Sequence, residues 1–148
     1  MALLVPFDGS VLATAALERA AEFAQYRDEE VVALSVVPDD EEYLRNRGLL
    51  AEGADLDIDT LCTRFREQVD EVAPTAAFRC ETPESSESMT ATVIDDITRT
   101  IRQVAHDVDA SIIFIGSENA GRVSTPVTSV GSPISEDPQY DVHIVRHA

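Results

Sequence analysis

Short apolar runs alternate with amphipathic segments along the whole chain. The strand-like runs are ALLVPF (residues 2–7), VVALSVV (31–37), AAFRCE (76–81), SIIFIG (111–116) and DVHIVR (141–146). The first, second and fourth runs carry almost no polar residues, which is typical of strands that are buried on both faces of a sheet. The pattern therefore predicts five short strands, of which the third is the weakest.

Apolar residues at helical spacing lie between these strands. They predict three helices, over residues 10–26, 61–72 and 93–108. Ser10 supplies an N-cap for the first helix, and Pro74 ends the second. Residues 39–56 are acidic and contain two glycines, which indicates a loose helix followed by a loop. A short fourth helix is expected between the glycine-rich segment that follows residue 116 and the last strand.

Strands and helices that alternate in this way predict an α/β fold, with a five-stranded parallel sheet between two helical layers. We see no repeat and no linker, so we expect a single domain over residues 1–148. In such a sheet, ligands bind beyond the carboxyl ends of the strands, where the strand order reverses. Two segments are expected to meet there, namely Asp8-Gly9-Ser10 after the first strand and the glycine-rich loop after the fourth.

These two segments contain residue types that suit a nucleotide. Gly116, Gly121 and Gly131 allow tight turns and a close approach of the backbone to a ligand. Ser132 offers a hydroxyl group at the start of a predicted helix, whose N-terminus favours an anion. The Asp8 carboxylate can accept hydrogen bonds from a ribose or an adenine edge. The alternative is that the glycines only form turns.

The charge of the chain excludes several partners. It has 28 acidic and 11 basic residues, which gives a net charge of −17, and all of the basic residues are arginine. Such a surface repels nucleic acid and anionic lipid, so we expect neither a nucleic-acid nor a membrane partner. Abundant Asp and Glu without Lys is expected of a halophilic archaeon, because self-repulsion is screened over about 3 Å at 1 M salt.

Features missing from the sequence predict the cellular location of the protein and the absence of a metal site. The longest apolar runs have five to seven residues, no signal peptide is recognisable, and we expect a cytoplasmic protein. In a reducing cytoplasm, Cys62 and Cys80 are expected to be free, buried thiols. His106, His143 and His147 have no Cys or His at ligand spacing, so no metal site is expected.

Taken together, LLVPFDGS, ALSVVPDD, the run DASIIFIGS, the late Gly131-Ser132 and VHIVR resemble the universal stress protein (UspA-like) family over nearly the whole chain. The resemblance implies the adenine nucleotide alpha hydrolase-like fold, which is Rossmann-like, and a homodimer that pairs through the C-terminal strand. It also implies a dimeric stress-response or signalling module that binds ATP or AMP. The nucleotide contacts implied are Asp8 and Val36 for the nucleoside, and Gly116, Gly121, Gly131 and Ser132 for the phosphates.

The chain also departs from the pattern of the ATP-binding members. Four residues, rather than two, separate Gly116 from Gly121. Pro133 follows Gly131-Ser132, and a proline has no backbone N–H to donate to a phosphate, although it suits the first position of a helix. Two functions therefore stay open. One is nucleotide binding, and the other is a protein-interaction module of the same family that binds no nucleotide.

Enzymatic alternatives fit the sequence poorly. The segment GSENAGRV resembles a P-loop, but Arg122 replaces the lysine, Val123 replaces the Mg²⁺-binding hydroxyl residue, and the segment follows the fourth strand rather than the first. A phosphoacceptor receiver domain needs a lysine, which this chain lacks. No Gly-x-Ser-x-Gly nucleophile motif occurs. We therefore expect no enzymatic activity.

Overall fold

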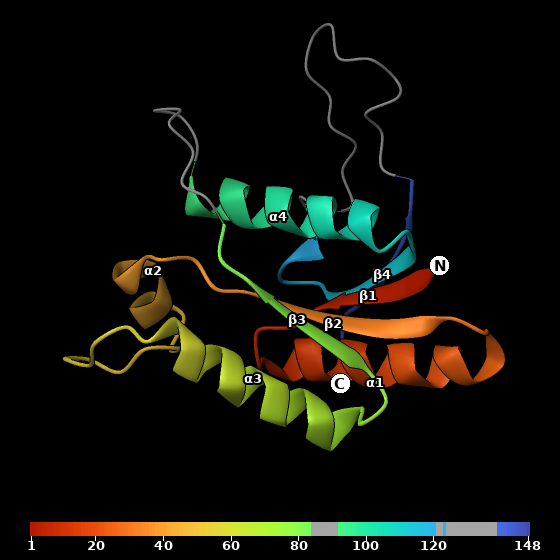
Figure 1. Ribbon diagram of the computed structural model, residues 1–148, viewed down its shortest axis with the longest axis horizontal. Helices are drawn as coiled ribbons and strands as arrows, with labels where there is room; N and C mark the ends of the chain where they lie inside the picture. Colours follow the sequence, from red (N-terminus) through yellow and green to blue (C-terminus); the bar gives the residue numbers. More distant parts are fainter. Residues whose placement is uncertain (84–91, 121–122, 124–138) are drawn as a thin grey trace, which may run out of the picture.

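The computed structural model describes residues 1–83, 92–120, 123 and 139–148, and these form a three-layer α/β fold (Figure 1). The strands are β1 (Ala2–Pro6), β2 (Glu30–Val36), β3 (Ala77–Glu81), β4 (Ala110–Gly116) and β5 (Asp141–Val145). The helices of the described residues are α1 (Val11–Tyr26), α2 (Glu41–Asn46), α3 (Ile58–Val72) and α4 (Val93–Asp107). The strands form one sheet in the order β3-β2-β1-β4-β5, and every pair is parallel. The predicted fold class is confirmed.

Each face of the sheet has its own apolar core. Along β1, Leu3 and Val5 belong to the cluster beneath α1 and α3, whereas Ala2 and Leu4 belong to the cluster beneath α4. Figure 1 shows α4 on one side of the sheet and α1 and α3 on the other. Successive side chains of a strand point to opposite faces, so a strand packed on both faces must be apolar at every position. This explains why the first strand carries no polar residue.

The predicted strands lie within two residues of the observed ones. Helix α3 begins earlier than its apolar spacing indicated, because the Asp57 side chain caps it by accepting a hydrogen bond from Thr60 N at 3.2 Å. The ambiguous acidic segment contains the single short helix α2, which is capped by Asp40. The predicted fourth helix and most of the loop 82–92 lie outside the described residues. Among the described helices, none is both long enough and apolar enough to span a bilayer.

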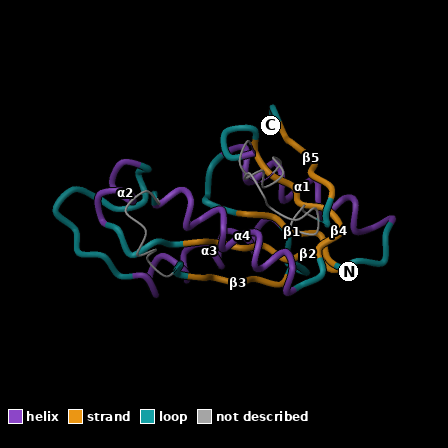
Figure 2. Tube along the Cα trace, turned by 90° about the horizontal axis from the view of Figure 1, so that it is seen from above, coloured by secondary structure: helices purple, strands orange, loops and turns teal. Residues whose placement is uncertain are grey.

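The two edges of the sheet are formed by β3 and β5, which lie on opposite sides in Figure 2. Strand β5 pairs with β4 from Ile112↔Asp141 to Gly116↔Val145. On the side of the sheet beneath α1, the His143 ring of β5 stacks on Phe114, with ring centroids 4.9 Å apart. Phe23 of α1 contacts both rings edge-on. The last strand is thus anchored to the sheet by its backbone and by this aromatic cluster.

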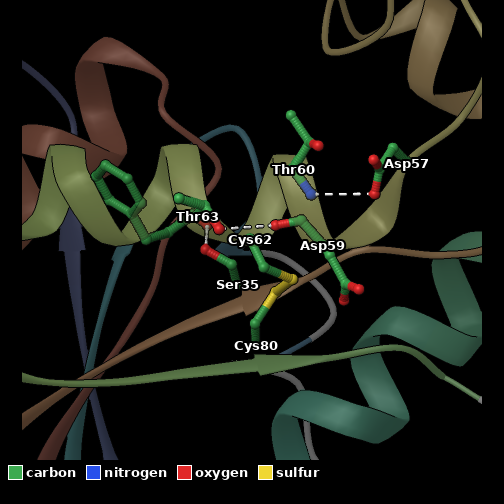
Figure 3. Close-up of a disulfide and its surroundings, with 8 residues drawn as sticks. Ser35, Asp57, Asp59, Thr60, Cys62, Thr63 and Cys80 are labelled. Atoms are coloured by element: carbon green, nitrogen blue, oxygen red, sulfur yellow. Dashed lines mark hydrogen bonds between the residues drawn. A yellow bond between two sulfur atoms is a disulfide. The ribbon is translucent and has the colours of Figure 1, made fainter.

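The expectation of free cysteine thiols is wrong. Cys62 of α3 and Cys80 of β3 form a disulfide, with their Cα atoms 5.9 Å apart (Figure 3). Both residues are half-buried rather than buried. No local pattern indicates the pairing, because the cysteines are 18 residues apart and meet only when α3 packs over the edge strand. The disulfide therefore joins the helical layer directly to one edge of the sheet.

Candidate functional site

The strand order reverses between β1 and β4. From β1 the chain adds β2 and β3 on one side of the sheet, whereas β4 and β5 are added on the other side of β1. Three of the sequence-predicted site residues lie at this end of the sheet. Asp8 follows β1, Val36 ends β2, and Gly116 ends β4. The fold brings these residues to one edge because parallel strands all end on the same side. Gly121, Gly131 and Ser132 lie outside the described residues, as does Pro133.

The Asp8 carboxylate is fixed by the turn that starts α1. Its Oδ1 accepts a hydrogen bond from Ser10 N at 3.0 Å, and Ser10 Oγ in turn accepts one from Ala13 N at 3.2 Å. Asp8 thus holds the N-cap residue in place, which is a common use of Asp in turns. Its second oxygen, Oδ2, points to the turn after β4 and accepts from Asn119 Nδ2 at 3.4 Å. The Asp8 side chain is half-buried.

Gly9 has a backbone conformation that favours glycine, with φ of +78°. A Cβ atom at this position would lie 3.1 Å from Gln68 Oε1 and 3.4 Å from the Phe65 ring. Both of these residues belong to α3, and Phe65 also packs edge-on against Phe7, with ring centroids 6.1 Å apart. Gln68 Oε1 is buried and has no hydrogen-bond partner among the described residues. Helix α3 therefore forms one wall of the loop that carries Asp8.

Gly116 is needed for packing, whether or not a ligand binds. A Cβ atom on this buried residue would lie 2.8 Å from the Cβ of Leu12, in the first turn of α1. The absence of a side chain lets α1 approach the end of β4 closely. Its backbone carbonyl then accepts a hydrogen bond from Asn119 N at 3.0 Å and closes the turn. This turn brings Asn119 alongside Asp8.

Val36 ends β2, on the side of the sheet that faces the edge strand β3. It pairs with Glu81 of the edge strand, and its half-buried side chain packs with the apolar cluster beneath α4. The neighbouring Ser35 is fully buried, and its hydroxyl donates to the Phe7 carbonyl at 2.7 Å. This hydrogen bond ties β2 to the chain just before Asp8. The end of β2 is thereby held in register with the loop after β1.

Three residues that the sequence did not single out complete this edge of the sheet. Arg47, just after α2, donates from Nη2 to Asn119 Oδ1 at 3.2 Å and from Nε to the Tyr43 hydroxyl at 3.1 Å. Its guanidinium lies over the Tyr43 ring, 5.4 Å from the centroid. The hydrogen bond with Tyr43 is the main cause that raises the pKa of Arg47, and attraction by Asp8 and Glu118 adds to it.

A signal for Asn119 was present in the sequence. It lies three residues beyond the end of the fourth strand, where a turn had to form at the ligand-binding edge. For Tyr43 and Arg47 there was no such signal. Their segment is acidic and irregular, and only the folded chain brings Arg47 to Asn119, which lies 72 residues away in sequence. In the part of the chain that the structure describes, no cluster of three or more His, Cys, Asp or Glu side chains could hold a metal.

The universal stress protein family model matches residues 1–146. The chain belongs to the universal stress protein family. Its membership agrees with the five-stranded parallel sheet. Among curated proteins, no sequence matches this universal stress protein.

Solved universal stress proteins share the fold at low sequence identity. One from Burkholderia pseudomallei is 20% identical, with a TM-score of 0.58 over 97% of this chain and 93% of that one. Another, solved in complex with cAMP, is 18% identical, with a TM-score of 0.53 over 100% of this chain and 98% of that one. A third, from Archaeoglobus fulgidus in complex with dAMP, is 18% identical, with a TM-score of 0.52 over 99% and 98% of the two chains.

Proposed function

We propose that this chain is a non-enzymatic stress-response module that binds an adenine nucleotide at the carboxyl ends of β1 and β4. The observation that carries the proposal is the hydrogen bonding of the Asp8 carboxylate. Its Oδ1 is committed to the turn, whereas its Oδ2 meets only a long hydrogen bond of 3.4 Å from Asn119 among the described residues. A ribose hydroxyl or an adenine amino group can replace that bond. The cAMP and dAMP complexes of two structural relatives support this ligand class.

Nucleotide content and affinity test the proposal. The protein is purified in high KCl and denatured, and the released small molecules are separated by chromatography. AMP and ATP are then titrated calorimetrically into the wild type, Asp8→Asn and Asp28→Asn. Asp28 is exposed and lies between α1 and β2, at the opposite end of the sheet, so its substitution makes the same charge change away from the site.

We expect bound or micromolar nucleotide in the wild type and a loss of about tenfold to a hundredfold in Asp8→Asn, because a charge-assisted hydrogen bond is weakened. Asp28→Asn should bind like the wild type. No released nucleotide, together with no heat at millimolar AMP and ATP, would refute nucleotide binding. Function would then have to reside in the surface, as in an interaction module of the same family.

A homodimer through β5 is the second part of the proposal. The strand is at a sheet edge, and its described partner is β4, on one side. An edge strand that offers unpaired N–H and C=O groups favours pairing with another chain. Light scattering in high KCl should give twice the mass of the chain. A monomeric mass at every protein concentration tested would contradict this arrangement.

We propose a cytoplasmic location, which requires that the disulfide be stable in that compartment. A reducing compartment keeps most cysteines as thiols, so Cys62–Cys80 would have to resist reduction there. Rapid alkylation of intact cells, followed by mass spectrometry, reports the state directly. A disulfide that persists in the cytoplasmic fraction agrees with the proposal, whereas recovery of the protein only in an extracytoplasmic fraction contradicts it.

A further inference from the structure

Arg47 extends from the end of α2 over the carboxyl edge of the sheet. Figure 1 shows α2 beside the end of the sheet where the chain leaves β2. Arg47 is the C-cap residue of this helix. Its contact with Asn119 joins α2 to the turn after β4, and Asn119 in turn contacts Asp8. A positive charge is therefore linked to the proposed nucleoside contact through a single amide side chain.

The guanidinium is held in place before any ligand arrives. Tyr43, one helical turn earlier, contacts it through both the hydroxyl and the ring, and Tyr43 itself packs against the apolar cluster beneath α1 and α3. Such support lowers the entropy that an arginine loses when it binds a ligand. An arginine used only for solubility does not need these contacts.

The local charge makes a cation necessary for an anionic ligand. The chain carries a net charge of −17, and two of its carboxylates, Asp8 and Glu118, act on Arg47. A phosphate attached to a nucleoside at Asp8 would be repelled by both. Arg47 counters this repulsion. Its hydrogen bonds to Tyr43 and Asn119 use two of its five N–H groups, and the one to Asn119 is with a neutral amide.

We infer that Arg47 binds the phosphate group of the nucleotide whose nucleoside contacts Asp8, and that Asn119 bridges Arg47 and Asp8 until the nucleotide replaces it. The inference rests on the proposed function and names the residue that distinguishes a nucleotide from a nucleoside. On binding, the bond of Arg47 to Asn119 is exchanged for charge-assisted bonds to phosphate oxygens, which are shorter and stronger. The planar guanidinium suits two phosphate oxygens at once.

The test compares adenosine with AMP in the full-length protein. Both are titrated calorimetrically into the wild type, Arg47→Gln, Arg47→Lys and the matched control Arg45→Gln. Arg45 lies in the same helix, but its Nη2 contacts Glu41 and the Ala54 carbonyl, both at 3.2 Å. Arg47 is exposed, so its variants should fold, and thermal unfolding by circular dichroism verifies this.

We expect Arg47→Gln to lower AMP affinity about tenfold to a hundredfold and to leave adenosine affinity within about twofold. Arg47→Lys should recover part of the loss, since it restores the charge but not the planar fork. Equal losses for AMP and adenosine, or equal AMP affinity in Arg47→Gln and Arg45→Gln, would overturn the assignment while nucleotide binding stands. A wild type that binds neither compound overturns both the assignment and the proposed function.

Discussion

The Cys62–Cys80 disulfide should supply a large part of the stability of this domain. The perturbation is its removal, either by a reducing agent or by the double substitution Cys62→Ala with Cys80→Ala. The two cysteines are 18 residues apart. In the chain-entropy description, cross-linking a loop of this length destabilises the unfolded state by about 3 kcal/mol. For a chain of about this size, that corresponds to a fall in Tm of roughly 6–12 °C.

The position of the disulfide indicates which parts of the fold its removal should loosen. Cys80 lies in the edge strand β3, which pairs with β2 from Val32↔Ala77 to Val36↔Glu81. Cys62 lies one helical turn before the part of α3 that contacts Phe7 and Gly9. Reduction should therefore loosen an edge strand and the helix beside the Asp8 loop at the same time. Hydrogen exchange should rise first in β3 and α3.

The assay is thermal unfolding followed by circular dichroism in high KCl, with and without dithiothreitol. Thiol titration of the denatured, unreduced protein should find no free thiol, because the structure contains no free cysteine. The double alanine variant is the control, since the reducing agent has nothing to cleave there and its Tm should not change. Two titratable thiols in the unreduced protein, or a Tm that moves by less than about 1 °C on reduction, would refute this reasoning.

Three further outcomes follow from contacts and charge. Gly116→Ala should cost about 1–3 kcal/mol in the free energy of unfolding, because its Cβ would clash with the Cβ of Leu12, and Leu12→Ala should not rescue it. Glu29 accepts a hydrogen bond from Ser111 at 2.6 Å, which is the main cause that lowers the pKa of Glu29. Glu29→Gln should therefore cost about 1 kcal/mol at neutral pH. The pKa of Glu29 is lower in the folded than in the unfolded state, so the difference in unfolding free energy between the wild type and Glu29→Gln should shrink as pH falls through the folded pKa. Chemical denaturation across the acid range measures this difference, and a difference that stays constant would contradict the reasoning. With a net charge of −17, Tm should rise from 0.1 to 3 M KCl as repulsion is screened, and a flat Tm would exclude this effect.

The candidate site was predictable only where one residue and its neighbours in sequence determine the geometry. Asp8-Gly9-Ser10 follows an apolar strand and precedes a helix, so the turn and its N-cap could be predicted. Gly116 could be predicted as the end of a strand, but its closeness to Leu12 depends on how α1 packs. Tyr43 and Arg47 belong to a segment without hydrophobic periodicity. Their position at the site follows from the link to Asn119 and not from local sequence.

By itself, the sequence determined the strands, the three long helices and the α/β fold class. Apolar runs and helical spacing are local signals, and burial on both faces leaves little choice for residues such as Leu3, Leu4 and Val5. Tertiary structure alone decided the disulfide between Cys62 and Cys80 and the Asp8–Asn119–Arg47 link. These contacts join residues that are distant along the chain. Their distances depend on how whole helices and strands pack, and no local pattern records that packing.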